Sequence, residues 1–192
     1  MHSDLTLLQS IPLFNGIKKE ELRGMLGCLN ARKQRYEAGE VILLAGERAG
    51  NVGVLLSGRA QVVREDYAGN RTILTQLSPG ELFAEVFACA SGSAKTLPIS
   101  VLSIVESEAL LLDYRRIISS CTSACAFHTR LIENMLAVLA NKSLLLNRRL
   151  GHLSKRSTRE KLLSYLEEQA AFHNSRSFAI EFNRQELADY LC

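Results

Sequence analysis

The chain lacks any long apolar segment, since its longest uninterrupted apolar run is six residues, 135–140. A helix that spans a bilayer needs about 20 such residues, so we expect no membrane partner. The first residues, Met-His-Ser-Asp, lack the basic and then apolar pattern of a signal peptide. The five cysteines, an odd number without an export signal, favour free thiols in a reducing compartment. These features predict a cytoplasmic protein.

The chain also lacks the common catalytic motifs. It has no Walker-type phosphate loop, no Gly-x-Ser-x-Gly elbow and no His-Glu-x-x-His metalloprotease motif. Glu81 and Glu85 could mimic the paired carboxylates of a cupin-like barrel enzyme, but such a metal site needs histidine ligands. The four histidines stand at 2, 128, 152 and 173, outside the β-rich segment described below. We therefore expect that the protein is not an enzyme.

The composition is that of a folded globular chain. It has 192 residues, of which 47% are hydrophobic and 22% charged, which suits one large domain or two small ones. Residues 142–192 contain nine basic and six acidic side chains, which account for the net charge of +3. Six of the basic residues cluster around a single acid, Glu160: Arg148, Arg149, Lys155, Arg156, Arg159 and Lys161. This cluster predicts contact with phosphate groups, although a solvated helix face is the alternative.

Residues 36–112 have the pattern of short strands separated by turns. Glycines recur at 39, 46, 58, 69 and 80, and β-rich runs lie between them at 41–44, 52–56, 60–63 and 72–74. This spacing predicts a small antiparallel barrel, with a hairpin tip at 66–70 and one long strand at 99–105. Before it, 18–29 is predicted as a helix with Leu22, Met25, Leu26 and Leu29 on one face.

From 122 to 153 the apolar period becomes helical. One stripe alternates spacings of four and three, as in a coiled-coil seam: Ile132, Leu136, Leu139, Ser143, Leu146, Leu150 and Leu153. A second stripe, expected to pack against the barrel, contains Leu131, Met135, Val138 and Leu145. A helix that is apolar on two sides favours a homodimer, with a monomeric core helix as the alternative. The break at 154–156 is a candidate hinge.

The remaining residues predict two further helices. Ser157 and Glu160 form a capping box ahead of a helix whose inner face would contain Leu162, Leu163 and Leu166. Asn183 and Glu186 form a second capping box, followed by Leu187, Tyr190 and Leu191 on one face. We interpret this last segment as the first helix of a helix-turn-helix. An ordinary amphipathic terminal helix is the alternative.

This order of elements resembles the Crp/Fnr family of transcription regulators over essentially the whole chain. The markers are the glycine-punctuated barrel, the segment Pro-Gly-Glu-Leu-Phe-Ala-Glu-Val at 79–86 and the segment Arg-Gln-Glu-Leu-Ala-Asp-Tyr-Leu at 184–191. The resemblance implies an α+β fold: an effector-sensing β-roll or jelly-roll barrel (1–120), a long dimerisation helix with its hinge (121–154), and an incomplete winged helix-turn-helix (155–192).

The resemblance also implies a function. A bacterial homodimer would bind a small-molecule effector in its β-roll, couple it through the dimer helices to double-stranded DNA, and act on RNA polymerase. Lys155, Arg156, Arg184 and Gln185 are the candidate DNA contacts. The family's recognition helix and β-wing would come after residue 192, so we expect the chain itself to bind an operator poorly.

The effector site is inferred from the same resemblance. Ala84-Glu85-Val86 stands where the family has Gly-Glu-Leu, Lys95-Thr96 stands for Arg-Ser, and Leu146-Asn147 for an adenine-contacting Thr-Ser pair. In the family the glutamate accepts a hydrogen bond from a ribose hydroxyl, while the arginine and backbone amides bind the cyclic phosphate. Only Glu85 matches outright, and lysine lacks the bidentate fork of arginine. These departures favour another small ligand or a vestigial site, and leave a cyclic nucleotide as an open alternative.

Metal or redox sensing is a second possibility. Cys121, Cys125 and His128 would share one helix face, and sulfur with imidazole suits zinc or a thiol switch. The competing interpretation, which we favour, has buried apolar cysteines and His128 at the surface. We therefore predict a ligand-responsive, DNA-binding regulator. The alternative is a redox- or ligand-sensing dimer that acts through protein partners without reading DNA.

Overall fold

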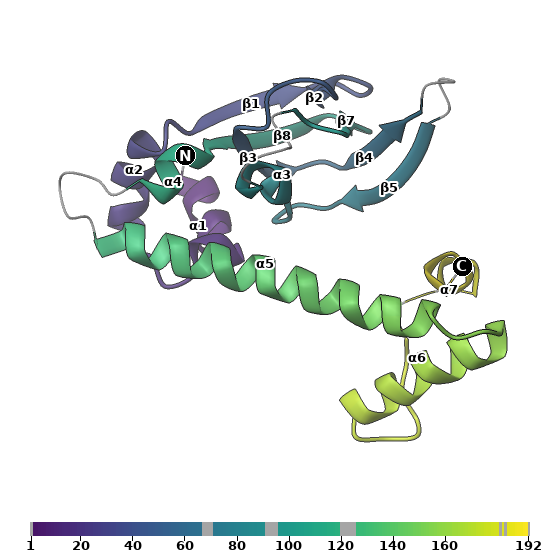
Figure 1. Ribbon diagram of the computed structural model, residues 1–192. Coiled ribbons are helices and arrows are strands. Elements are labelled where there is room, and N and C mark those ends of the chain that lie inside the picture. Colours follow the sequence, from purple (N-terminus) through teal and green to yellow (C-terminus); the bar gives the residue numbers. More distant parts are fainter. Residues whose placement is uncertain are drawn as a thin grey trace. The chain divides into compact units, whose positions relative to one another are not determined.

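The computed structural model describes residues 2–66, 71–90, 96–119, 126–180, 182 and 184–191. Of residues 2–5, 126, 186 and 189 it describes only the backbone. The chain forms two compact units, Met1–Val138 and Leu139–Cys192, whose elements are labelled in Figure 1. The three-part domain division expected from the sequence stays a prediction. Within the described ranges, no helix is both long and apolar enough to cross a bilayer.

The first unit contains two four-stranded antiparallel sheets that face each other. One sheet has the order β1-β8-β3-β6 and the other β2-β7-β4-β5. Their strands are β1 (Arg32–Tyr36), β2 (Val41–Leu43), β3 (Asn51–Ser57), β4 (Ala60–Glu65), β5 (Arg71–Leu77), β6 (Leu82–Phe83), β7 (Ser100–Ser103) and β8 (Ser107–Asp113). This β-roll confirms the barrel predicted from the glycine spacing.

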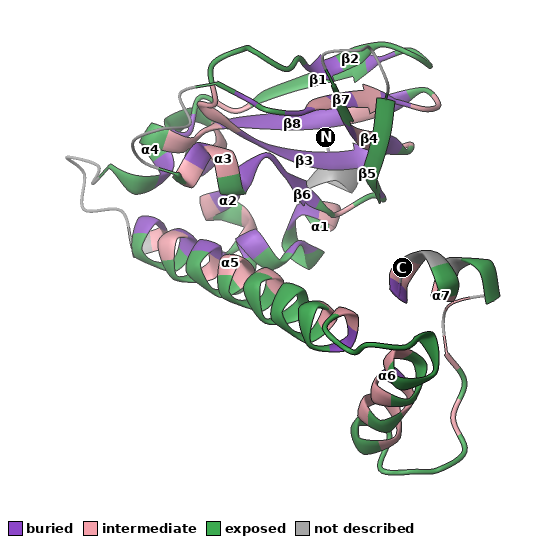
Figure 2. Ribbon diagram, turned by 45° about the vertical axis from the view of Figure 1, so that its right-hand side comes forward, coloured by how far each residue is buried: buried purple, intermediate pink, exposed green. Residues whose placement is uncertain are grey.

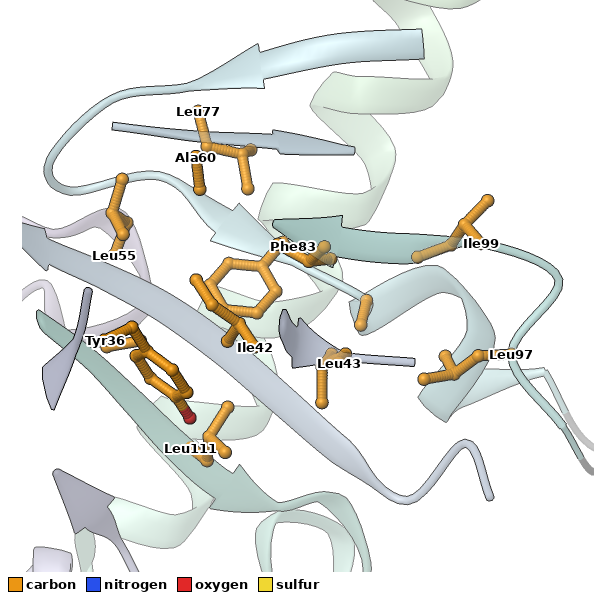
Figure 3. Close-up of a cluster of buried hydrophobic side chains, with 13 residues drawn as sticks. Tyr36, Ile42, Leu43, Leu55, Ala60, Leu77, Phe83, Leu97, Ile99 and Leu111 are labelled. Atoms are coloured by element: carbon orange, nitrogen blue, oxygen red, sulfur yellow. The ribbon is translucent and has the colours of Figure 1, made fainter. Parts of the chain in front are cut away.

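Side chains from both sheets form the core between them. The buried cluster contains Tyr36, Ile42, Leu43, Leu55, Ala60, Leu77, Phe83, Ala84, Leu97, Ile99, Val101, Ala109 and Leu111 (Figure 3). Strands β4 and β5 pair along their length, from Ala60 opposite Leu77 to Glu65 opposite Arg71. The predicted hairpin is therefore confirmed, while most of its predicted tip lies outside the described residues.

The long strand predicted at 99–105 is wrong in its length. Strand β7 ends at Ser103, and the chain bends over residues 104–106 before β8 begins at Ser107. The Ser107 hydroxyl donates to the Val105 carbonyl at 2.7 Å, which closes this bend. The apolar alternation continued through the turn, so the sequence pattern gave no sign that the strand ended there.

Helices at one end of the β-roll pack together and enclose a second group of buried apolar side chains in this unit. They are α1 (His2–Ser10), the 3-10 helix η1 (Pro12–Phe14), α2 (Lys19–Cys28) and α4 (Tyr114–Ile118), grouped beside the first turns of α5 (Ala126–Leu153) (Figure 1). Leu22, Met25 and Leu29 are completely buried, as the predicted helix face required, and Leu26 is partly exposed. The Asn134 amide of α5 donates to the carbonyls of Leu13 and Asn15, at 3.0 and 2.8 Å.

The two apolar stripes of α5 have different surroundings. In the inner stripe Leu131 and Met135 are buried, as predicted, but Leu145 is 60% exposed, so the expectation that it is buried is wrong. Figure 2 shows that the buried positions are mainly in the first turns of α5. The inner stripe is therefore covered only where the helix lies on the first unit's own helices.

The second unit combines the end of α5 with α6 (Thr158–Phe172) and α7 (Arg184–Leu191). The Ser157 capping box is confirmed: its hydroxyl accepts from the Glu160 amide at 3.2 Å, and the Glu160 carboxylate accepts from the Ser157 amide at 3.0 Å. The inner face predicted for α6 is wrong at Leu162 and Leu163, which are 36% and 47% exposed, while Leu166 is partly exposed. The buried side chain is Tyr165.

Tyr165 is buried because aromatic partners surround it. Its ring centroid lies 5.8 Å from Tyr190, 5.9 Å from His152 and 6.2 Å from Phe182. Tyrosine has a large, mostly apolar side chain whose ring can pack edge to face against other rings. The spacing of the leucines in the sequence does not reveal this packing. Leu191 of α7 is also buried, as its predicted face required. That α7 begins a helix-turn-helix stays a prediction.

Candidate effector site and nucleic-acid interface

Glu85 is the most informative residue of the predicted effector site. It is the first residue of α3 (Glu85–Cys89) and is only 2% exposed. A carboxylate is seldom buried without a partner or a function. Such a side chain accepts hydrogen bonds when ionised, so it is suited to hold a hydroxyl or another donor group of a ligand.

The backbone before Glu85 adopts a conformation that glycine would favour. Ala84 has φ 62° and ψ 1°, in the left-handed region. For a residue with a side chain this conformation costs about 1–2 kcal/mol. The sequence comparison with Gly-Glu-Leu therefore identified a real backbone requirement, which this chain meets with alanine.

A close contact between strands sets the position of this turn. Strand β6 pairs with β3, Gly53 lying opposite Phe83. The Phe83 ring occupies the space where a side chain at position 53 would stand, and Figure 3 shows Phe83 inside the core cluster. Because Phe83 is fixed in this way, Ala84 and Glu85 follow it at a defined place at the edge of the core.

Thr96 enters the same region from a different segment. It forms an isolated antiparallel bridge with Arg48, and the Leu97 amide donates to the Glu47 carbonyl at 2.8 Å. Leu97 belongs to the same core cluster as Phe83 and Ala84, so the segments that contain Glu85 and Thr96 border one core.

Arg48 was not singled out in the sequence analysis. Directly paired residues of an antiparallel bridge project their side chains to the same face, and both Arg48 and Thr96 are exposed. A guanidinium therefore projects to the same face as Thr96, one of the residues predicted for the effector site. Position 48 is about 50 residues before position 96, so no local motif connects them.

The structure does not test the other predicted effector residues as a group. Val86 is 51% exposed on α3, and Lys95 lies outside the described residues. Leu146 and Asn147 are exposed and belong to the second unit. Their part in effector binding stays a prediction.

Cys89, at the end of α3, is close to the effector site. Burial raises the pKa of its thiol, an effect that a hydrogen bond with the Tyr114 hydroxyl partly opposes and that the nearby charge of Glu85 reinforces. The thiolate is the nucleophilic form of cysteine, so this environment makes Cys89 less reactive at neutral pH.

His128 is placed differently from the favoured expectation. It is 7% exposed instead of lying at the surface. Its Nε2 lies 3.3 Å from the Arg116 carbonyl of α4, and its ring packs on Phe127 at 4.8 Å. His128 thus joins the start of α5 to α4, and this contact explains its burial.

The predicted metal site at His128 also involves two cysteines. Cys121 and Cys125 lie outside the described residues. Among the residues that are described, no three His, Cys, Asp or Glu side chains are grouped as a metal ion would require. The cysteine and histidine face at 121–128 stays a prediction.

The seam predicted for dimerisation is largely open. Leu136, Leu146 and Leu150 are each 61% exposed, Ser143 is exposed, and Ile132, Leu139 and Leu153 are partly exposed. Leu146 and Leu150 lie one turn apart and form an exposed apolar stripe on one helix face, and Leu136 lies nearly three turns before Leu146 in the same predicted seam. Such stripes commonly mark interaction surfaces.

Half of the predicted phosphate-binding cluster is engaged within the second unit. Arg148 lies 3.4 Å from the Glu168 carboxylate, and Arg149 donates to the Tyr190 carbonyl at 3.1 Å. The Lys161 ammonium donates to the Leu191 carbonyl at 3.1 Å. These three side chains attach helices to one another, and their predicted phosphate contacts stay a prediction.

The other basic residues of the cluster are exposed. Lys155, Arg156 and Arg159 lie at the turn between α5 and α6 and at the start of α6, and Arg184 and Gln185 begin α7. These positions agree with a surface that contacts a nucleic acid. Whether they do so stays a prediction.

Comparison with known proteins shows what the first unit is similar to. Residues 33–123 match the family described as "Cyclic nucleotide-binding domain". Over these residues the chain is similar to cyclic nucleotide-binding domains. Over 105 residues it is 28% identical to the cyclic AMP receptor protein of Thermus thermophilus, a match that covers 55% of this chain and 46% of that protein. The match thus spans about half of that curated relative.

Solved structures of regulators have the same fold. The sensor domain of the transcriptional regulator DNR from Pseudomonas aeruginosa superposes with a TM-score of 0.60 at 21% identity, covering 81% of this chain and 97% of that one. The c-di-GMP responsive global regulator CLP of Xanthomonas campestris gives 0.60 at 17% identity, covering 91% and 84%. The resemblance to the Crp/Fnr family drawn from the sequence is confirmed.

Proposed function

We propose that the cyclic nucleotide-binding domain of this chain senses a small anionic effector and that the protein is a DNA-binding transcription regulator of the Crp/Fnr type. The observation that carries the sensing proposal is the buried carboxylate of Glu85 at the edge of the core. The exposed Arg48 and Thr96 pair borders the same core. Together these residues offer an acceptor for a ligand hydroxyl and a cation for its anionic group.

The effector class is argued from the chemistry of these side chains. A cyclic nucleotide has both a hydroxyl and a phosphate, and the relatives include a cyclic AMP receptor protein and a c-di-GMP responsive regulator. The departures at Ala84 and Lys95 weaken the argument for cyclic AMP itself. We therefore propose a hydroxylated phosphate or carboxylate, with cyclic AMP and cyclic di-GMP as the first compounds to test.

The effector proposal is tested by thermal unfolding of the whole chain. A ligand at about 100 times its dissociation constant stabilises the folded state by about 2.7 kcal/mol. At this chain length that corresponds to a rise of several degrees in Tm. The test compounds are cyclic AMP, cyclic di-GMP and a panel of phosphorylated and carboxylated metabolites.

Two variants and one control make this test specific. Glu85→Gln should abolish the rise, because an amide is a weaker acceptor than a carboxylate, and Arg48→Gln should reduce it. Arg64→Gln alters an exposed arginine on β4 and should leave it unchanged. A panel that gives no rise with the wild type, or the same rise in Glu85→Gln, contradicts the assignment.

Dimerisation and DNA binding complete the proposal. The exposed leucines Leu136, Leu146 and Leu150 would become buried against a second copy of the chain. The basic side chains at the α5–α6 turn and at the start of α7 would contact DNA phosphates. RNA polymerase is the further partner that this type of regulator implies. Such a regulator acts in the cytoplasm and needs no catalytic activity.

The alternative is a redox-sensing dimer that acts through protein partners. Within the described residues, Cys89 is a poor candidate for the thiol switch that this alternative needs, because burial raises the pKa of the Cys89 thiol. We expect iodoacetamide at neutral pH to label Cys89 more slowly than the exposed Cys28, as measured by mass spectrometry of the labelled peptides. Preferential labelling of Cys89 would favour the redox alternative.

A further inference from the structure

The last turn of α5 contains a buried histidine that has a hydrogen-bond partner at each of its two ring nitrogens. His152 is 5% exposed. Its Nε2 lies 2.7 Å from the Glu168 carboxylate and its Nδ1 lies 2.9 Å from the Ser164 hydroxyl. Ser164 and Glu168 are four residues apart on α6, so they stand one above the other on the same helix face. One ring of α5 is thus held by two successive turns of α6.

The hydrogen-bond chemistry fixes the orientation of this ring. An ionised carboxylate only accepts, so the Nε2 of His152 must donate to Glu168. In the neutral imidazole Nδ1 then accepts from the Ser164 hydroxyl, and the serine is able to donate there. A rotation of the ring, or a change in the angle between the two helices, breaks both bonds at once.

The neighbouring side chains strengthen the same connection. Arg148 of α5 lies 3.4 Å from the other oxygen of Glu168, and the His152 and Tyr165 rings form a T-shaped pair with 82° between their planes. Arg149, one residue on, donates to the Tyr190 carbonyl and lies over the Tyr190 ring at 4.9 Å. The end of α5 is therefore attached to α6 and to α7 by separate contacts.

The backbone of the turn is also closed. The Ser154 hydroxyl donates to the Gly151 carbonyl at 2.9 Å, and the Lys155 amide donates to the His152 carbonyl at 3.2 Å. Ser157 then caps α6 with two bonds to Glu160. The turn at 154–156, in which the sequence suggested a hinge, has little unsatisfied backbone at which to bend.

We propose that His152, Ser164 and Glu168 form a clasp that makes the α5–α6 turn a rigid elbow. The end of α5 and all of α6 then move as one body, and any displacement of α5 passes into α6 without being absorbed at residues 154–156. His152 is a positioning residue in this arrangement. The clasp itself does not depend on the proposed function; only its use in signalling does.

The clasp is tested by the distribution of distances across the elbow. Spin labels on noncanonical amino acids at Asn141 of α5 and Ala171 of α6, both exposed, leave the native cysteines untouched. The labelled full chain is diluted with unlabelled chain, so that only distances within one molecule contribute. The wild type should give a single narrow distribution by double electron–electron resonance.

The variants separate the clasp from ordinary packing. His152→Phe keeps an aromatic ring but loses both bonds, and Glu168→Ala removes the carboxylate; both should broaden the distribution. Glu167→Ala, at the exposed neighbouring glutamate, is the matched control and should not. We also expect amide exchange at Lys155 to become roughly ten-fold faster in His152→Phe, as for the loss of a hydrogen bond to a charged group.

Each outcome decides the proposal. A broad or multiple distribution in the wild type shows that the turn is a hinge and overturns it. A narrow distribution that persists in both variants shows that other contacts fix the elbow and also overturns it. None of these results depends on an effector or on DNA, so failure of the clasp can be distinguished from failure of the proposed function.

Discussion

Replacing Leu146 by aspartate should dissociate the proposed dimer. Leu146 is 61% exposed in the isolated chain. Full burial of a leucine stabilises by about 1.5–3 kcal/mol, so burial of the exposed part contributes about 1–2 kcal/mol per copy. A symmetric dimer loses this contribution twice, about 2–4 kcal/mol, which corresponds to a roughly 30- to 700-fold weaker dimer. The desolvation of a carboxylate would add to this loss.

The assay is sedimentation equilibrium over a range of chain concentrations, with wild type and variant at the same ionic strength. Leu144→Asp is the control, because Leu144 is 55% exposed on the same helix but lies outside the seam. We expect the wild type and Leu144→Asp to dimerise with similar dissociation constants, and Leu146→Asp to be monomeric at concentrations at which they are dimers. A monomeric wild type, or equal weakening by the two substitutions, would refute the assignment of the seam.

Two further predictions concern the stability of each unit. Gly53→Ala should destabilise the first unit by about 1–3 kcal/mol, because the new methyl group overlaps the Phe83 ring. Gly24→Ala is the control: its new methyl group, inside α2, meets no other atom, and it should stabilise the unit by about 0.5–1 kcal/mol. Urea unfolding of the two variants measures both changes. In the second unit, hydrogen bonds with the Ser157 amide and then with its side chain lower the pKa of the Glu160 carboxyl below its ordinary value of 4.5. The stabilisation by the hydrogen bonds of the Glu160 carboxylate is therefore complete above about pH 4.5 and is lost as the pH falls through the lowered pKa. Glu160→Gln should remove this acid dependence. Thermal unfolding of wild type and variant at pH 7 and in acid measures it.

Much of the fold could be predicted because its signals are local. The glycine spacing predicted the strands of the β-roll, and the capping box at Ser157 predicted the start of α6 to within one residue. Leu131 and Met135 were correctly assigned to the inner face of α5. Each of these features depends on residues within a few positions of one another.

The errors arose where distant residues decide the surroundings. The α6 leucines have the apolar character of an inner face, yet Tyr165 occupies the interior because Tyr190 and Phe182 supply ring contacts from beyond α6. Arg149 and Lys161 counted as free positive charges in the sequence, although carbonyls of α7 accept their hydrogen bonds. No spacing rule within one helix predicts such partners.

The effector site contains one residue that a local motif predicted and one that only the fold brings close. Glu85 was identified because it lies in a recognisable turn, and its burial agrees with a functional carboxylate. Arg48 was missed because its neighbour Thr96 comes from a strand-like segment far along the chain. The likeness to a cassette identified the carboxylate, whereas the arginine beside Thr96 became apparent only from the pairing of the two segments.

The central claim, that effector sensing at Glu85 controls binding to DNA, is tested most directly by mapping where the protein binds on the chromosome. The protein is expressed from its own locus as wild type and as Glu85→Gln, and bound DNA is identified by chromatin immunoprecipitation and sequencing. Our account predicts a discrete set of sites for the wild type, each with two symmetric half-sites spaced about one helical turn apart, and altered occupancy in Glu85→Gln at an unchanged amount of protein. The absence of enriched sites, or equal occupancy in the two strains, would contradict it.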